Sequence, residues 1–105
     1  MIVAFSVAPA AAQVADGSVH DAVAAAVAVV RASGLPNRTS SMFTEIEGEW
    51  DEVMDVVKRA TEAVTAVSDR VSLVLKADIR AGRTGELDGK VERLEQALAE
   101  RERGA

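Results

Sequence analysis

The sequence predicts a single α+β domain in which helices cover one face of an antiparallel sheet. Residues 2–8 and 70–79 alternate side chains between two faces, as strands buried on one side do. Three other segments carry apolar residues at helical spacing. A length of 105 residues corresponds to one domain, so residues 1–105 are expected to fold as one unit.

The first strand and first helix occupy the N-terminal third. The strand at residues 2–8 ends before Pro9, which cannot donate to a ladder, and residues 10–17 form a loop. A helix is expected from Ser18, as N-cap, to about residue 33, because Gly34 and a following proline end it. We expect its buried stripe to be Val19, Val23, Val27 and Val30. This helix is apolar nearly all round, which also favours a partner subunit.

The middle of the chain predicts a strand pair and a helix. Residues 37–41 are a weak strand and 42–47 a better one, ended by Gly48. Acidic residues after Gly48 suit the N-terminus of the next helix. Its expected buried stripe is Trp50, Val53, Val57, Thr61 and Val64.

The last third predicts a strand and an appended helix. In residues 70–79 the core face is expected to hold Val71, Leu73, Leu75, Ala77 and Ile79. The C-terminal helix is expected over residues 87–103, and residues 88–105 are the appended segment, whose end is expected to fray. Its apolar stripe is Leu87, Val91, Leu94 and Leu98.

The order of these elements is that of a ferredoxin-like βαββαβ sandwich with an extra C-terminal helix. Four antiparallel strands form one sheet, and two helices cover one of its faces. We expect the extra helix either to cover the open face or to dock on another subunit. On our register the open face is polar, carrying Ser6, Glu45, Glu47, Ser72, Lys76 and Asp78.

Composition excludes several classes of protein. A net charge of -5 with a pI near 4.8 argues against nucleic acid as a partner, and the lack of Cys excludes disulfides and thiolate metal sites. The longest apolar run, residues 22–30, is too short to cross a membrane, and no basic segment precedes the first strand, so we expect a cytoplasmic protein. Most apolar residues are Ala or Val, and a core of such small side chains favours burial between subunits.

Few residues of the sequence suggest a catalytic or ligand-binding role. His20 is the only histidine, and we expect it at the surface; no catalytic motif or metal-binding set accompanies it. Glu47 ends a strand and could point into a cavity between the sheet and the second helix. Lys76 and Asp78 share a face, as either a surface ion pair or a polar pocket wall. Trp50 suits a core anchor better than a ligand-stacking plate.

Four segments, taken together in order and spacing, resemble a known family. They read Met1-Ile-Val-Ala-Phe-Ser-Val-Ala-Pro, Met42-x-Thr44-x-Ile46-Glu47-Gly48-Glu49-Trp50-Asp51-Glu52-Val53-Met54, Val57-Lys58-Arg59 and Arg70-Val71-Ser72-x-Val74-x-Lys76-x-Asp78-x-Arg80. The chain resembles the small thiamine-binding proteins related to YkoF. The resemblance implies a ferredoxin-like subunit of a homotetramer that binds thiamine or its hydroxymethylpyrimidine half without catalysis.

The implied ligand fits the chemistry of several residues. A carboxylate could accept a hydrogen bond from the exocyclic amine, hydroxyls could bond ring nitrogens, and an aromatic side chain could flank a ring. The expected ligand-binding residues are Ser6, Thr44, Glu47, Trp50, Lys76 and Asp78, with no metal and no cofactor besides thiamine as ligand. The chain departs from the family at Phe43, where a small residue is usual, and at residues 37–41.

Two other functions stay open. One is a structural or regulatory oligomer without a small ligand, whose open sheet face serves only as an interface. The other is a cofactor-free enzyme of the α+β-barrel kind, which would need an acid or base inside its cavity. In either case the expected partner is a second copy of the chain, in a homotetramer or dimer of dimers.

Overall fold

The computed structural model describes residues 1–10, 18–82 and 84–104. The loop expected at residues 10–17 lies almost wholly outside this description, as does the side chain of Ser18. The elements are β1 (Ile2–Pro9), α1 (Ser18–Ala32), β2 (Asn37–Thr39), β3 (Thr44–Glu47), α2 (Trp50–Thr65), β4 (Val71–Asp78) and α3 (Glu86–Gly104). Their order is the expected one.

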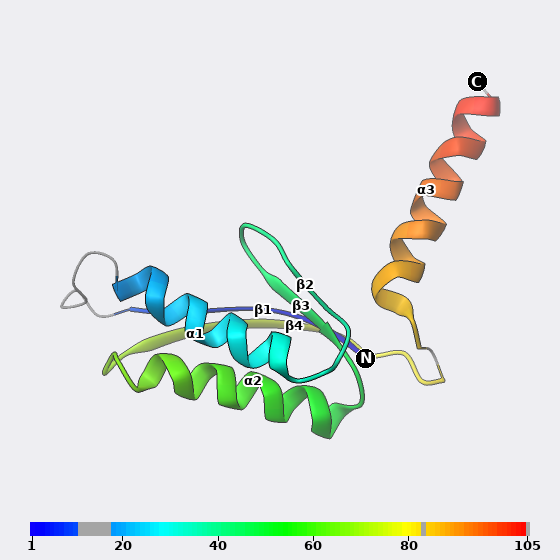
Figure 1. The fold of residues 1–105 in the computed structure, drawn as a ribbon. Helices are drawn as coiled ribbons and strands as arrows, with labels where there is room; N and C mark the ends of the chain where they lie inside the picture. The colour runs from blue at the N-terminus through cyan, green and yellow to red at the C-terminus, as the bar shows by residue number, and fades with distance from the viewer. Residues whose placement is uncertain (11–17, 83, 105) are drawn as a thin grey trace.

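The strands form one antiparallel sheet in the order β2-β3-β1-β4, with α1 and α2 on the same face (Figure 1). This is the ferredoxin-like arrangement, so the predicted fold class is confirmed. In β1, Val3, Phe5 and Val7 face the helices and are buried. Pairing with β3 and β4 places the six polar residues predicted for the open face together on it.

Helix α2 follows its predicted pattern except at its start. A capping box between Glu49 and Glu52 begins the helix, and Val53, Val57 and Val64 are buried as expected. Trp50 was expected in the core, but 55% of its surface is exposed. As the first helical residue it precedes the part of α2 that packs on the sheet; the buried face is completed by smaller residues further along, Val56 and Ala60.

Helix α1 is turned from its predicted orientation. Val19 and Val23 are largely exposed, whereas Ala22, Ala26 and Val30 are buried. Val30 belongs to both the expected and the observed stripe, so the helix is rotated by less than the 100° of one residue. Because the helix is apolar on several sides, its pattern does not fix which side is buried, and the small Ala side chains let it approach the core closely.

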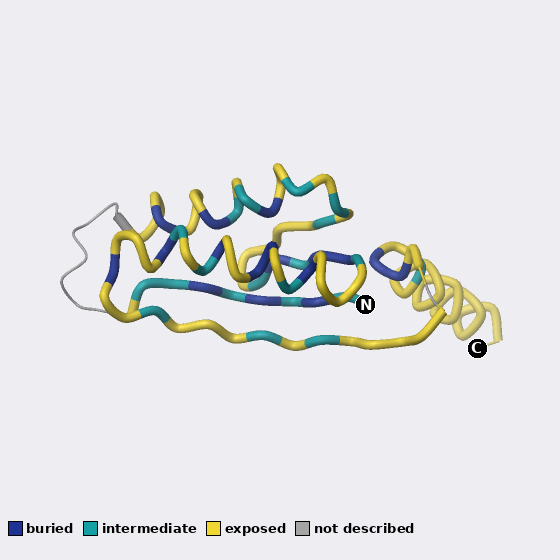
Figure 2. The backbone as a smooth tube through the Cα atoms, turned by 90° about the horizontal axis from the view of Figure 1, so that it is seen from below, coloured by how far each residue is buried: buried dark blue, intermediate teal, exposed yellow. Residues whose placement is uncertain are grey.

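Helix α3 points away from the sandwich (Figure 1), and only its first turn is buried, through Glu86 and Leu87. In Figure 2 it is coloured exposed beyond that turn. Val91, Leu94 and Leu98, predicted as its apolar stripe, are all exposed, and so is Ile79, which lies past the end of β4. Most of the open face therefore stays uncovered within one subunit. No helix in the described ranges combines the length and apolar character needed to cross a membrane.

Candidate functional site

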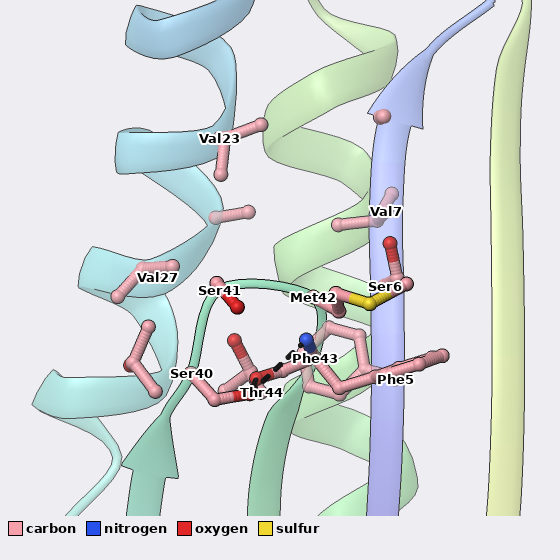
Figure 3. A pocket seen from close by; sticks show the side chains of 13 residues that line it. Phe5, Ser6, Val7, Val23, Val27, Ser40, Ser41, Met42, Phe43 and Thr44 are labelled. Atoms are coloured by element: carbon pink, nitrogen blue, oxygen red, sulfur yellow. Dashed lines mark hydrogen bonds between the residues drawn. The ribbon is translucent and has the colours of Figure 1, made fainter.

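A hollow of about 200 Å³ lies between α1, the middle of β1 and the turn joining β2 to β3 (Figure 3). We call it the hairpin pocket. Val23 and Val27 of α1 form one side, and Ser6 and Val7 of β1 form the other. Residues 39–44 close the third side.

The hairpin pocket exists because β3 stops pairing with β1 halfway along it. The last pair is Phe5 with Thr44, whereas β1 continues beside β4 as far as Pro9. Ser40 folds the turn: its N–H and its hydroxyl each donate to the Phe43 carbonyl at 2.9 Å. The tip of this hairpin stands away from β1 (Figure 1), and the turn residues line the pocket beside the strand.

The lining suits a small, uncharged ring. Two of the three aromatic residues of the chain, Phe5 and Phe43, lie here. Hydroxyl groups come from Ser6, Thr44 and the turn serines, and α1 adds valine methyls. The described residues that line the pocket include no ionisable side chain. Its aromatic carbon and hydroxyls offer packing and hydrogen bonds, the usual composition of a ligand pocket.

A second hollow lies under the first turns of α3, at the end of the open sheet face. Glu45, Lys76, Asp78 and Lys90 are among its lining residues. Lys76 and Asp78 share this face as predicted, but the Asp78 carboxylate accepts a hydrogen bond from Lys90 rather than from Lys76. This contact, first as a hydrogen bond and then as a charge interaction, lowers the pKa of Asp78.

Glu47 caps the N-terminus of α3, a structural role that its position in the sequence did not reveal. Its carboxylate accepts hydrogen bonds from the backbone N–H groups of Glu86 (2.8 Å) and Leu87 (3.2 Å), the first residues of α3. These are donors that a helix leaves without an internal partner, and a negative charge there is favourable. Glu47 is 6% exposed and acts across 39 residues as the cap of α3; it also lines a hollow of about 220 Å³ together with Glu49 and Glu52 at the start of α2.

The structure thus separates the six predicted ligand-binding residues into three places. Ser6 and Thr44 come together in the hairpin pocket. Lys76, Asp78 and Glu47 lie around the start of α3, and Trp50 is exposed on α2. The turn serines Ser40 and Ser41 also line the hairpin pocket, and no sequence pattern marks them because their place depends on where β3 leaves β1. Phe5 and Phe43 are aromatic side chains of the kind expected to flank a ring.

Histidine-based catalysis and metal binding find little support in the described part of the chain. His20 is exposed on α1, as expected. Within the described ranges, no three His, Cys, Asp or Glu side chains come close enough to hold a metal ion.

Fold and pocket define a ferredoxin-like α+β subunit with a ring-sized hollow beside its central strand. The family model described as "Thiamine-binding protein" matches residues 3–95, and the chain belongs to this family. The UPF0045 protein Mb1933 of Mycobacterium bovis is 52% identical over 99 residues, covering 93% of this chain and 94% of that protein.

Solved structures show the same fold. A candidate thiamine biosynthesis/salvage protein of Thermotoga maritima, TM0486, superposes with a TM-score of 0.73 at 30% identity, covering 89% of this chain and 96% of its own. A domain of unknown function, DUF77, from Bacillus cereus superposes with a TM-score of 0.70 at 34% identity, covering 81% and 82%.

Proposed function

We propose that the protein binds thiamine, or its hydroxymethylpyrimidine half, in the hairpin pocket and does not transform it. The observation that carries the proposal is the pocket itself, where two aromatic side chains and several hydroxyls meet in a chain of the thiamine-binding family. The similarity to the Thermotoga maritima protein supports the same ligand class.

The size of the pocket favours the pyrimidine ring as the buried half. Pockets for drug-sized ligands occupy about 300–1,000 Å³, whereas the hairpin pocket measures about 200 Å³. One ring with its small substituents fits this space, and the thiazolium would extend towards solvent. The net charge of -5 favours approach of that cation.

Within the pocket, Ser6 and Thr44 would bond the ring substituents and nitrogens, since a hydroxyl both donates and accepts. Phe43, half-buried in the turn, would flank the ring. The other predicted residues lie elsewhere in the subunit. The hollow beside Lys76 and Asp78 is the alternative location for the ligand.

A binding role agrees with the lining better than catalysis does. General acid–base catalysis needs a titratable group within hydrogen-bond reach of the substrate. The described lining of the hairpin pocket supplies hydroxyls and apolar groups only, apart from the main chain.

We also propose that the protein works as a homo-oligomer, a tetramer or dimer of dimers. Val91, Leu94 and Leu98 form an exposed apolar stripe along α3, beyond the one turn that packs on the subunit. Val74 is exposed on the open face of the sheet. A second copy of the chain would cover both surfaces.

Calorimetric titration tests the binding proposal. Thiamine and hydroxymethylpyrimidine are titrated into the wild type, into Thr44→Val, and into Thr65→Val as a matched control on the exposed side of α2. Loss of one hydrogen bond should weaken binding to Thr44→Val by about 3- to 10-fold and leave Thr65→Val unchanged. Absence of a binding signal at millimolar ligand with the wild type would overturn the proposal.

A further inference from the structure

Successive residues of β1 direct their main-chain N–H and C=O groups alternately towards β3 and towards β4. Met1 exchanges two hydrogen bonds with Gly48, both of 3.1 Å, on the β3 side. On the β4 side, the N–H of Ala10 donates to the carbonyl of Arg70 at 2.8 Å. In an antiparallel ladder these directions alternate by residue. Odd-numbered residues of β1 therefore direct their N–H and C=O groups towards β3, and even-numbered residues towards β4.

Val7 directs its main-chain groups towards the β3 side, but β3 ends before it reaches Val7. The register pairs Phe5 with Thr44, so its continuation would place Met42 opposite Val7. Met42 instead belongs to the turn that lines the hairpin pocket and is largely exposed. Among the hydrogen bonds of the described residues, none reaches the main chain of Val7 from this side.

Val7, whose main-chain groups on the β3 side have no partner among the described residues, lines the hairpin pocket and is not at an open surface. Only 7% of the residue is exposed. Buried backbone N–H and C=O groups are almost always paired with protein, water or ligand. A ligand in the pocket thus meets one donor and one acceptor, side by side, at a fixed spacing.

The length of this free edge argues for a ring and against an added peptide strand. The next residue of the same alternation is Pro9, which has no N–H. Strand addition relies on a series of main-chain bonds along an edge. Here the edge offers one complete donor–acceptor pair, at Val7, and the turn and α1 enclose it.

We propose that the N–H and C=O of Val7 recognise the donor–acceptor edge of a 4-aminopyrimidine. The N–H donates to the ring nitrogen next to the amino group, and the amino group donates to the C=O. The ring takes the place that the next β3 residue would have occupied. This inference rests on the proposed function and adds the atoms that select the ligand.

Ligand analogues test the pairing. Oxythiamine carries an oxo group in place of the 4-amino group, so its edge presents donor and acceptor in reversed order, whereas pyrithiamine keeps the aminopyrimidine and changes the other ring. Calorimetry should show pyrithiamine binding like thiamine and oxythiamine binding about 10- to 100-fold more weakly, as for other two-bond edge recognition. Equal affinity of thiamine and oxythiamine would overturn the inference while leaving the proposed function intact.

Adenosine tests whether the pocket selects a single-ring pyrimidine, because it carries the same donor–acceptor pair on a larger fused ring. We expect it to bind much more weakly than thiamine in a pocket of about 200 Å³. If adenosine binds as tightly as thiamine, the assignment to a single-ring pyrimidine is wrong.

An NMR titration and a backbone variant locate the contact. Thiamine should shift the amide signal of Val7 more than that of Ala8, whose N–H belongs to the β4 side. Val7→Pro removes the N–H directed at the pocket, which the β4 ladder does not use, and Pro9 shows that this strand accommodates a proline beside β4. It should bind thiamine about 10-fold more weakly than Val7→Ala, which keeps the N–H.

The outcomes separate the two proposals. Thiamine binding without a shift at Val7 contradicts the main-chain contact alone, whereas no thiamine binding contradicts the proposed function. If Val7→Pro does not fold, the wild-type amide shift decides. A shift at Val7 with extended peptides but not with thiamine would assign the edge to strand addition and overturn the inference.

Discussion

The cap that Glu47 provides for α3 can be tested by one isosteric substitution. Glu47→Gln keeps the size of the side chain but replaces one accepting oxygen with an NH₂ group. The carboxylate accepts from the N–H groups of both Glu86 and Leu87, so the amide can satisfy only one of them. A hydrogen bond to a charged group contributes about 1.5–3 kcal/mol. Because α3 is otherwise attached to the subunit through Leu87 and two exposed ion pairs, Asp78–Lys90 and Arg38–Asp88, the loss should detach its first turn before the sandwich unfolds.

Amide hydrogen exchange measures this directly. The first N–H groups of a helix have no internal acceptor, so protection at Glu86 and Leu87 depends on Glu47. About 1.5–3 kcal/mol corresponds to roughly a 10- to 150-fold loss of protection at these two amides. The control Glu62→Gln, exposed on α2, should leave them unchanged. Unchanged exchange at Glu86 and Leu87 in Glu47→Gln would refute the capping role.

Three further predictions concern charge, packing and assembly. The Asp78–Lys90 contact should stabilise the attachment of α3 fully above the ordinary carboxyl pKa of 3.8 and be lost as pH falls through the lowered folded-state value. Ala26→Leu should cost about 1–3 kcal/mol of unfolding free energy because Ala26 is buried in the core. Leu94→Glu should dissociate the proposed homo-oligomer, since Leu94 lies in the exposed stripe of α3.

Each of these three predictions has its own measurement. An acid titration of α3 exchange rates should lose its low-pH step in Asp78→Asn; persistence of the step would contradict the assignment. Urea unfolding compares Ala26→Leu with Ala25→Leu, whose side chain is exposed, and equal midpoints would contradict the observed orientation of α1. Light scattering gives the mass of Leu94→Glu, and a wild-type mass would exclude this stripe from the interface.

The sequence predicted the fold well where a pattern has only one physical solution. The alternation of β1 defines its buried face, and Val53, Val57 and Val64 define the inner side of α2. In β4, Val71, Leu75 and Ala77 pack partly against the core, but Leu73, which was also expected there, is 43% exposed because no helix covers its part of the sheet fully. In α1 the apolar residues surround the axis, so the burial of Ala22 and Ala26 in place of Val19 depends on close packing that periodicity does not encode.

The candidate site could be predicted only in part, because it depends on contacts distant in sequence. The resemblance predicted that Ser6 and Thr44 both bind the ligand, and the structure places them in one pocket. It could not show that Glu47 meets α3 across 39 residues. Nor could it show that β3 leaves β1 after Phe5, which creates the pocket and frees the backbone of Val7.

A crystal structure of the chain grown with thiamine tests the central claim most directly. We predict the pyrimidine ring between α1 and the β2–β3 turn, with its amino edge against Val7 and its face beside Phe43. A ligand seated instead beneath α3, against Lys76 and Asp78, would contradict this account, and so would a hairpin pocket left empty at saturating thiamine.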